Sequence, residues 1–119
     1  MELAYRNLKV WHKSLSLIKS VYCAAEKLPK CEESNLTHRL RSSVVAVALN
    51  IAEGKSRKTA KEFSDFLDLS VCALHEAEAV LVICLELGYL KSIDAIHAEI
   101  TSLAKTINAF KESLHVNEN

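Results

Sequence analysis

Residues 59–87 read TAKEFSDFLDLSVCALHEAEAVLVICLEL, and this stretch decides the fold class. Apolar or small residues recur in it at alternating spacings of four and three, which is the period of one face of an α-helix. The stretch opens with a capping box, in which Thr59 and Glu62 satisfy free backbone N–H groups at a helix start. It therefore predicts one long amphipathic helix that ends at Gly88. Its buried face is expected to consist of Phe63, Leu67, Ser70, Leu74, Ala77, Leu81 and Cys84.

Three further segments, residues 8–28, 34–53 and 93–114, carry stripes of the same period. Pro29 ends the first, Gly54 follows the second as a left-handed C-terminal cap, and Ser92 caps the last. Short connections make consecutive helices antiparallel neighbours. We therefore expect one all-α domain over residues 1–119, an antiparallel up-down-up-down four-helix bundle. The three expected stripes are Leu8, Trp11, Leu15, Ile18, Tyr22, Ala25 and Leu28; Leu36, Leu40, Val44, Val47 and Ile51; and Ile93, Ile96, Ile100, Leu103, Ile107, Phe110 and Leu114.

The composition narrows the function classes. With 15 basic and 15 acidic residues the formal net charge is zero, so the chain as a whole gives no support to nucleic-acid binding. Two glycines and one proline argue against a β-sandwich or barrel, which needs many tight turns. The N-terminus lacks a signal-peptide pattern, and no apolar run approaches membrane-spanning length. We expect a cytoplasmic protein with no membrane partner.

No motif for catalysis, metal binding or a cofactor is found. A nucleotide-binding loop needs more glycines than the chain has, and Asp94 and His97 form only one aspartate version of a di-iron Glu-x-x-His motif. We expect a protein that is not an enzyme, with no catalytic residues, no metal site and no cofactor. The cysteines lack a C-x-x-C spacing, so free thiols packed as small hydrophobes are favoured over a disulfide framework or a zinc site. They are Cys23, Cys31, Cys72 and Cys84.

Residues 44–49 and 79–85 are apolar around the full circumference of a helix, and the long helix carries a second apolar stripe. This is more apolar surface than one bundle buries. We interpret it as an interface between copies of the chain in a homo-oligomer. The alternative is that both helices are central and shielded by the other two. The candidate interface residues are Val45, Leu49, Phe66, Leu69, Val80 and Ile83.

A basic run, Lys-Ser-Arg-Lys-Thr-Ala-Lys, occupies residues 55–61, where two helices are joined. Lysine and arginine supply the phosphate contacts of sequence-independent nucleic-acid binding. The bundle topology brings Lys9 to the same end, together with Arg6 and Lys111, whereas Arg41 lies at the opposite end. Because acidic residues flank the run, the alternative is a solvated loop. The candidate RNA contacts are Lys55, Arg57, Lys58, Lys61, Lys9 and Arg41.

Asn50 and Glu53 form a polar pair directly after the apolar run at residues 44–49. A buried polar group without a partner costs about 1–3 kcal/mol, so both should be hydrogen-bonded. We interpret them as a network that fixes helix pairing or subunit register; the alternative is a ligand or RNA contact.

The sequence Asn-Ile-Ala-Glu-Gly at residues 50–54 resembles the signature of a bacterial family of four-helix-bundle proteins. Some members of this family are encoded in intervening sequences of large-subunit ribosomal RNA genes and carry a ribosomal-protein label. This chain departs from the family pattern at Ala46 and Ala48, where serine and proline are common. Further matching segments, in the family's order, are Leu8-Lys9-Val10-Trp11, Leu28-Pro29, Leu40-Arg41, Lys61-Glu62-Phe63, Phe66-Leu67, Glu76, Glu78, Leu81 and Leu87-Gly88-Tyr89-Leu90.

The resemblance implies a bundle assembled into a ring, a pentamer, and points to the accessory proteins of diversity-generating retroelements, similar bundles that bind nucleic acid and a reverse transcriptase. We therefore expect a non-enzymatic homo-oligomer that contacts structured RNA or an RNA-binding protein through its basic loops. The alternative is a protein-interaction module, an accessory or scaffold subunit with no nucleic-acid role.

Overall fold

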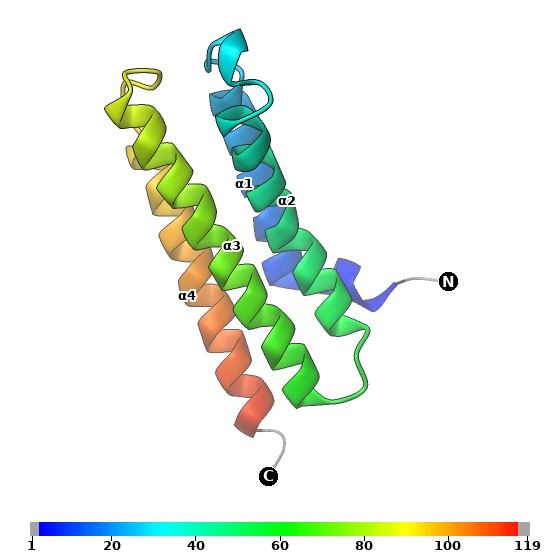
Figure 1. Cartoon of the computed structure of the whole chain (residues 1–119). Coiled ribbons are helices and arrows are strands. Elements are labelled where there is room, and N and C mark those ends of the chain that lie inside the picture. The colour runs from blue at the N-terminus through cyan, green and yellow to red at the C-terminus, as the bar shows by residue number, and fades with distance from the viewer. Residues whose placement is uncertain (1–2, 117–119) are drawn as a thin grey trace.

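The computed structural model describes residues 3–116, and four long helices dominate them: α1 (Lys9–Ala25), α2 (Leu36–Lys55), α3 (Ala60–Glu86) and α4 (Asp94–Val116). Two short 3-10 helices, η1 (Ala4–Asn7) and η2 (Lys30–Glu32), precede α1 and α2. No strand occurs within this described range. The chain is therefore all-α, a four-helix bundle (Figure 1).

Each long helix contacts two others, so that α1 packs on α2 and α4, and α3 packs on α2 and α4. Contacts between α3 and α4 join the first part of one helix to the last part of the other. Asp68 bonds to Lys111, near the end of the chain, whereas Glu78 bonds to His97. Neighbouring helices thus run in opposite directions, as the colours in Figure 1 also show.

The predicted buried faces of α2 and α3 are confirmed, because every residue of both stripes is buried. In α4 the middle of the stripe, Ile100, Leu103 and Ile107, is buried, and its ends are half-buried against the core. None of the helices in the described part of the chain combines the length and apolar character needed to cross a bilayer.

The expected stripe of α1 is confirmed at its C-terminal end, where Ala25 and Leu28 are buried, but along the rest of the helix a neighbouring face enters the core. Trp11, Leu15 and Ile18 are only half-buried, and Tyr22 is 39 % exposed. Small and β-branched side chains allow closer helix packing than these bulky ones. Ser14 can be buried among them because its hydroxyl donates a hydrogen bond to the Trp11 carbonyl oxygen at 2.6 Å. The face that enters the core consists of Val10, Ser14, Leu17, Val21, Ala24 and Ala25.

The expected end of α1 at residue 28 also differs from the structure, in which the helix ends at Ala25. The N–H groups of Lys27 and Leu28 bond to the carbonyls three residues before them, which tightens the chain out of the α-helix ahead of Pro29.

Gly54 corrects a second expectation, because it lies inside α2 and does not cap it. Gly88 ends α3 as predicted, with a positive φ of 80°. No other residue in the described range has a positive φ. Gly54 is buried, and a Cβ atom at this position would come within 2.8 Å of both Phe63 Cδ1 and Phe66 Cβ. The glycine therefore lets two aromatic side chains of α3 pack directly on the backbone of α2.

All four cysteines are free thiols, as expected, but only Cys84 is packed in the core. The other three are exposed, since they lie on the outer faces of α1 and α3 and in η2. The interpretation as small core hydrophobes is thus right for Cys84 and wrong for Cys23, Cys31 and Cys72.

Candidate functional site

Four of the predicted RNA contacts lie around the connection between α2 and α3. Lys55 ends α2, Arg57 and Lys58 follow it, and Lys61 is in the first turn of α3. The connection ends where the Thr59 hydroxyl accepts a bond from the Glu62 N–H at 3.1 Å, which confirms the Thr59 half of the predicted capping box. All four cations are exposed to solvent.

The N-terminal segment brings two more cations to this end. The 3-10 helix η1 packs against α2, and its residues share a cavity of about 420 Å³ with Ala52, Glu53 and Lys55. Arg6 lies in η1 and Lys9 begins α1, and both are exposed. We call this surface the basic end; it consists of Arg6, Lys9, Lys55, Arg57, Lys58 and Lys61.

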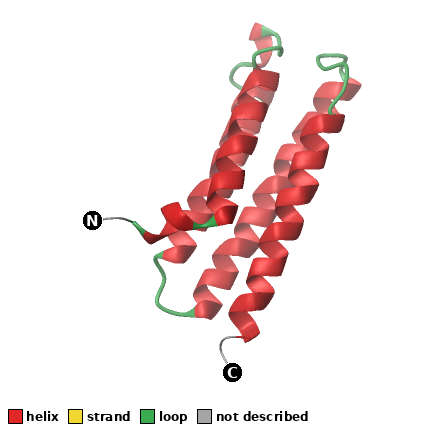
Figure 2. Ribbon diagram, turned by 180° about the vertical axis from the view of Figure 1, so that it is seen from behind, coloured by secondary structure: helices red, strands yellow, loops and turns green. Residues whose placement is uncertain are grey.

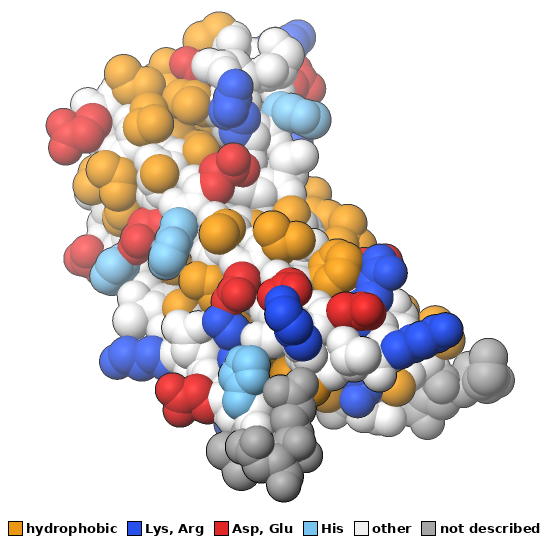
Figure 3. Space-filling model, turned by 60° about the horizontal axis from the view of Figure 1, so that its bottom comes forward, with side chains coloured by type: hydrophobic (Ala, Val, Ile, Leu, Met, Phe, Trp, Pro, Cys, Tyr) orange, Lys and Arg blue, Asp and Glu red, His pale blue; other side chains and the backbone are white. Residues whose placement is uncertain are grey.

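Carboxylates neutralise part of the basic end. Arg57 pairs with Glu53, and Lys61 Nζ lies 3.2 Å from Asp65 Oδ2, each one helical turn apart. Exposed pairs of this kind contribute only about 0.3–0.5 kcal/mol. Figure 3 shows blue and red side chains interspersed over this end of the molecule. Lys111, expected here as well, is held by Asp68.

Within the basic end, four of the six cations have no carboxylate partner among the described residues: Arg6, Lys9, Lys55 and Lys58. Two members of the basic end also lie over aromatic rings of α3. The Arg57 guanidinium carbon is 4.7 Å from the centre of the Phe66 ring, and Lys55 Nζ is 5.8 Å from that of Phe63. These ring contacts could not be foreseen from the sequence, because they depend on how α3 crosses Gly54.

Arg41 is separate from the basic end. It is half-buried in the first half of α2, where its guanidinium carbon lies 5.3 Å from the centre of the Tyr22 ring. Its Nε atom is buried without a hydrogen-bond partner. The structure therefore does not bring this candidate together with the other five.

The polar residues of the motif at residues 50–54 bond within α2 or directly after it. Asn50 Nδ2 donates to the carbonyl oxygen of Ala46, in its own helix, at 2.9 Å, and Glu53 is paired with Arg57. Gly54 lies against Phe63 and Phe66 of α3.

The candidate interface residues fall into three groups. Leu49, Leu69 and Ile83 are 60 %, 51 % and 46 % exposed. Val45 and Phe66 are half-buried. Val80 lies in the core, because it is on the inner side of α3. Leu87, which belongs to the second apolar stripe predicted for the long helix, is 54 % exposed.

Phe66, Leu69, Ile83 and Leu87 share one side of α3 by their helical spacing, and Phe66 lies against α2 at Gly54. Hydrophobic side chains gather in two groups over the α2 and α3 side of the molecule in Figure 3. We call the surface formed by Leu49, Phe66, Leu69, Ile83 and Leu87 the apolar face.

Two ionisable groups near the other end have shifted pKa values. The Tyr89 hydroxyl donates to Glu32 Oε2 at 3.0 Å, and this bond, with burial as a second cause, raises the pKa of Tyr89 above its ordinary value of 10.0. Burial raises the pKa of the Cys84 thiol. Among residues 3–115 no group of three or more His, Cys, Asp or Glu side chains could hold a metal ion.

The model of the 23S rRNA-intervening sequence protein family matches residues 6–109, which include α1 to α3 and most of α4. The chain belongs to this family. This finding confirms the resemblance seen at residues 50–54. None of the proteins with curated descriptions matches the chain.

Proposed function

We propose that this 23S rRNA-intervening sequence protein is a non-enzymatic protein that assembles with copies of itself and binds structured RNA through the basic end. One observation carries the proposal: Arg6, Lys9, Lys55 and Lys58 are exposed at one end without a carboxylate partner. The family description, which links the chain to an rRNA gene, supports an RNA-related role.

The binding would be electrostatic. Ammonium and guanidinium groups contact phosphates, release their counterions and lose affinity steeply as salt rises. A single basic end of this size gives weak binding. Repeating it in an oligomer makes the second contact intramolecular, which raises the overall affinity without any new contact.

Self-assembly is supported by the apolar face. Leu49 and Leu69 are each more than half exposed, on two helices that pack against each other. Apolar side chains grouped in this way on a soluble protein mark a contact with another protein surface. In a ring of identical chains, the apolar face of each copy would be covered by a different surface of the next copy, which is a heterologous interface.

RNA binding is tested by fluorescence anisotropy with a labelled RNA hairpin. The wild type is expected to lose at least about tenfold in affinity between roughly 50 and 200 mM salt. The double variant Lys55→Glu/Lys58→Glu should lose binding while its circular dichroism is unchanged. The matched control, Lys19→Glu/Lys105→Glu, reverses two exposed lysines elsewhere and should bind as the wild type does. Salt-insensitive binding, or binding that survives in the first variant, would favour the protein-interaction module instead.

Assembly is tested by light scattering on a size-exclusion column. The wild type should elute at a multiple of the chain mass of 13.2 kDa. Leu49→Glu/Leu69→Glu should shift the mass to that of one chain, because charges would be buried in the interface. Val82→Glu is the control, since Val82 is 43 % exposed on α3 but lies outside the apolar face. A wild-type mass of 13.2 kDa would refute self-assembly.

A further inference from the structure

Three cavities lie in a row along the seam between α1 and α4, the two helices nearest the viewer in Figure 2. The largest, about 620 Å³, is bounded by the second half of α1 and by residues 89–96. The middle one, about 370 Å³, and the lowest, about 220 Å³, continue it toward the start of α1. We call this row of cavities the seam groove.

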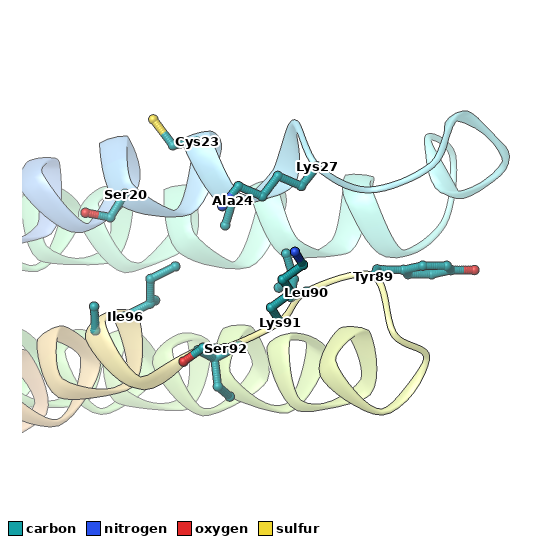
Figure 4. A pocket seen from close by; sticks show the side chains of 11 residues that line it. Ser20, Cys23, Ala24, Lys27, Tyr89, Leu90, Lys91, Ser92 and Ile96 are labelled. Atoms are coloured by element: carbon teal, nitrogen blue, oxygen red, sulfur yellow. The ribbon is translucent and has the colours of Figure 1, made fainter.

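Cations predominate along the seam groove. Lys9, Lys13, Lys27 and Lys91 line it, whereas Glu99 is the sole carboxylate in the lining of these three cavities. In Figure 4 Lys27 and Lys91 come from opposite walls of the largest cavity, one from the turn that follows α1 and one from the connection that precedes α4.

Lys13 shows that this positive charge is not compensated within the chain. Its half-buried ammonium group donates to Ser102 Oγ and Thr106 Oγ1, both at 3.1 Å, across the seam. Both acceptors are neutral hydroxyls. Glu99 accepts a bond from Ser20, on α1, and pairs with no lysine. The groove therefore attracts carboxylates from outside.

The walls beneath these cations are apolar. Ala24 and Leu90 are buried under the largest cavity, Leu103 is buried under the middle one, and Phe110 lines the lowest. An occupant needs apolar side chains for this floor as well as negative charge for the rims.

A protein segment satisfies both demands better than RNA does. Binding of single-stranded RNA relies on aromatic rings on which bases stack. In Figure 4 the ring of Tyr89 points away from the cavity, and its hydroxyl is bonded to Glu32. Phe110 packs edge-on against Phe63, with ring centres 5.4 Å apart. No ring in the groove is free for a base.

The length of the groove indicates a helix. From Lys9 to Lys27 α1 and the turn that follows it extend for about 27 Å at 1.5 Å per residue, which matches about five turns of a partner helix. A helix laid in a groove buries an apolar stripe and presents charges along its edges. We propose that the seam groove binds an acidic amphipathic helix of a partner protein, with carboxylates against Lys27 and Lys91. This function goes beyond RNA binding at the basic end, with which the groove shares only Lys9.

The probe for the test is a fluorescein-labelled synthetic peptide of about 18 residues, with leucine on one helical face and glutamate on both flanks. Its control is a peptide of the same composition in scrambled order. The designed peptide should bind the whole protein with a micromolar dissociation constant, and the scrambled one at least about tenfold more weakly.

Two variants place the peptide in the groove. Lys27→Glu/Lys91→Glu reverses the rim charges, and Ala95→Glu puts a carboxylate into the largest cavity from an exposed position of α4. Each should weaken peptide binding at least about tenfold. Asn108→Glu adds the same charge at an exposed site on α4 that lines none of the three cavities, and should change nothing.

Three results would overturn the proposal. The first is equal binding of both peptides, or designed-peptide binding that Ala95→Glu leaves intact. The second is loss of RNA-hairpin binding in Ala95→Glu, which would make the groove part of the RNA site. The third is a change of oligomeric mass in Ala95→Glu, which would make its occupant a second copy of this chain. Loss of peptide binding with RNA binding retained supports the proposal and leaves the function of the basic end standing on its own test.

Discussion

The α2–α3 seam and the α1–α4 seam of this bundle are built in opposite ways. Between α2 and α3, the backbone at Gly54 meets two aromatic side chains, and the fully buried Ser70 hydroxyl donates to the Val47 carbonyl oxygen at 2.9 Å. Between α1 and α4, Lys13 reaches across to two hydroxyls, and three cavities remain.

The size of the side chains at each seam explains this difference. Glycine and serine let helices approach closely, because they place few or no atoms between the backbones. A lysine that bridges two helices holds them apart, since its stem and partners occupy the space between them. The bundle therefore has one closed seam beside its apolar face and one open seam lined by cations.

Thiol reactivity should show the largest contrast. Cys84 of α3 is buried, and burial raises its pKa, whereas Cys23 of α1 is exposed beside the open seam. Alkylation at neutral pH, followed by mass spectrometry, should modify Cys84 at least about a thousandfold more slowly than Cys23. That ratio corresponds to an opening free energy of about 4 kcal/mol. Rates within about tenfold of each other would mean that α3 is not closed over its core.

Filling the two seams with the same residue should give the next largest effect. Gly54→Leu forces side-chain atoms into the space of Phe63 and Phe66, and should lower the free energy of unfolding by about 3 kcal/mol. Ala95→Leu, at an exposed position that lines the open seam, should change it by less than about 0.5 kcal/mol. Urea unfolding followed by circular dichroism measures both. Similar losses in the two variants would contradict the distinction between the seams.

A smaller effect is expected from hydroxyl removal. Ser70→Ala deletes a buried hydrogen bond between α3 and α2 and should cost about 1 kcal/mol. Ser102→Ala removes an exposed hydroxyl that accepts from Lys13 across the open seam, and should cost less than about 0.5 kcal/mol. Urea midpoints of the two variants, compared at one pH, give the order; the reverse order would refute the assignment of the closed seam.

The smallest effect concerns the end of the bundle. The Tyr89–Glu32 bond joins the connection before α4 to η2, which closes the end of the open seam. Because the folded protein raises the pKa of Tyr89 above 10.0, this contribution is present below about pH 10 and is lost as pH rises through the folded-state pKa. Tyr89→Phe should thus be slightly less stable than the wild type at pH 7, and the difference should shrink as the pH rises through the folded-state pKa of Tyr89. A difference that stays constant over this range would show that the hydroxyl bond is not its cause.

The sequence predicted the parts of the fold that depend on local periodicity. The predicted stripes of α2 and α3 are correct in every residue, since each of these residues is buried. In α1 two apolar faces compete, one with Trp11 and Leu15 and one with Val10 and Leu17. Periodicity cannot rank them, because the choice depends on how closely the neighbouring helices approach.

The candidate site was less predictable than the fold. The cations of the basic end were found because they cluster in the sequence, but their pairing with Glu53 and Asp65 depends on side-chain geometry. The sequence predicts a cap at Gly54 because the apolar stripe ends just before it. Its actual role depends on Phe63 and Phe66, which belong to another helix and whose contacts the local sequence does not show. The seam groove was missed altogether, although Lys9, Lys13 and Lys27 repeat at one helical face of α1 and could have signalled it.

The rings of Phe63 and Phe66 have a thermodynamic consequence for the basic end. Flexible cations lose conformational entropy when they become fixed on phosphates, and this loss weakens binding. Lys55 and Arg57 lie over rings that the backbone at Gly54 already holds in place. Part of their freedom is thus lost when the bundle folds. If the basic end binds phosphates as proposed above, helix packing and phosphate binding are linked, and a substitution at Gly54 would disorder cations that it does not touch.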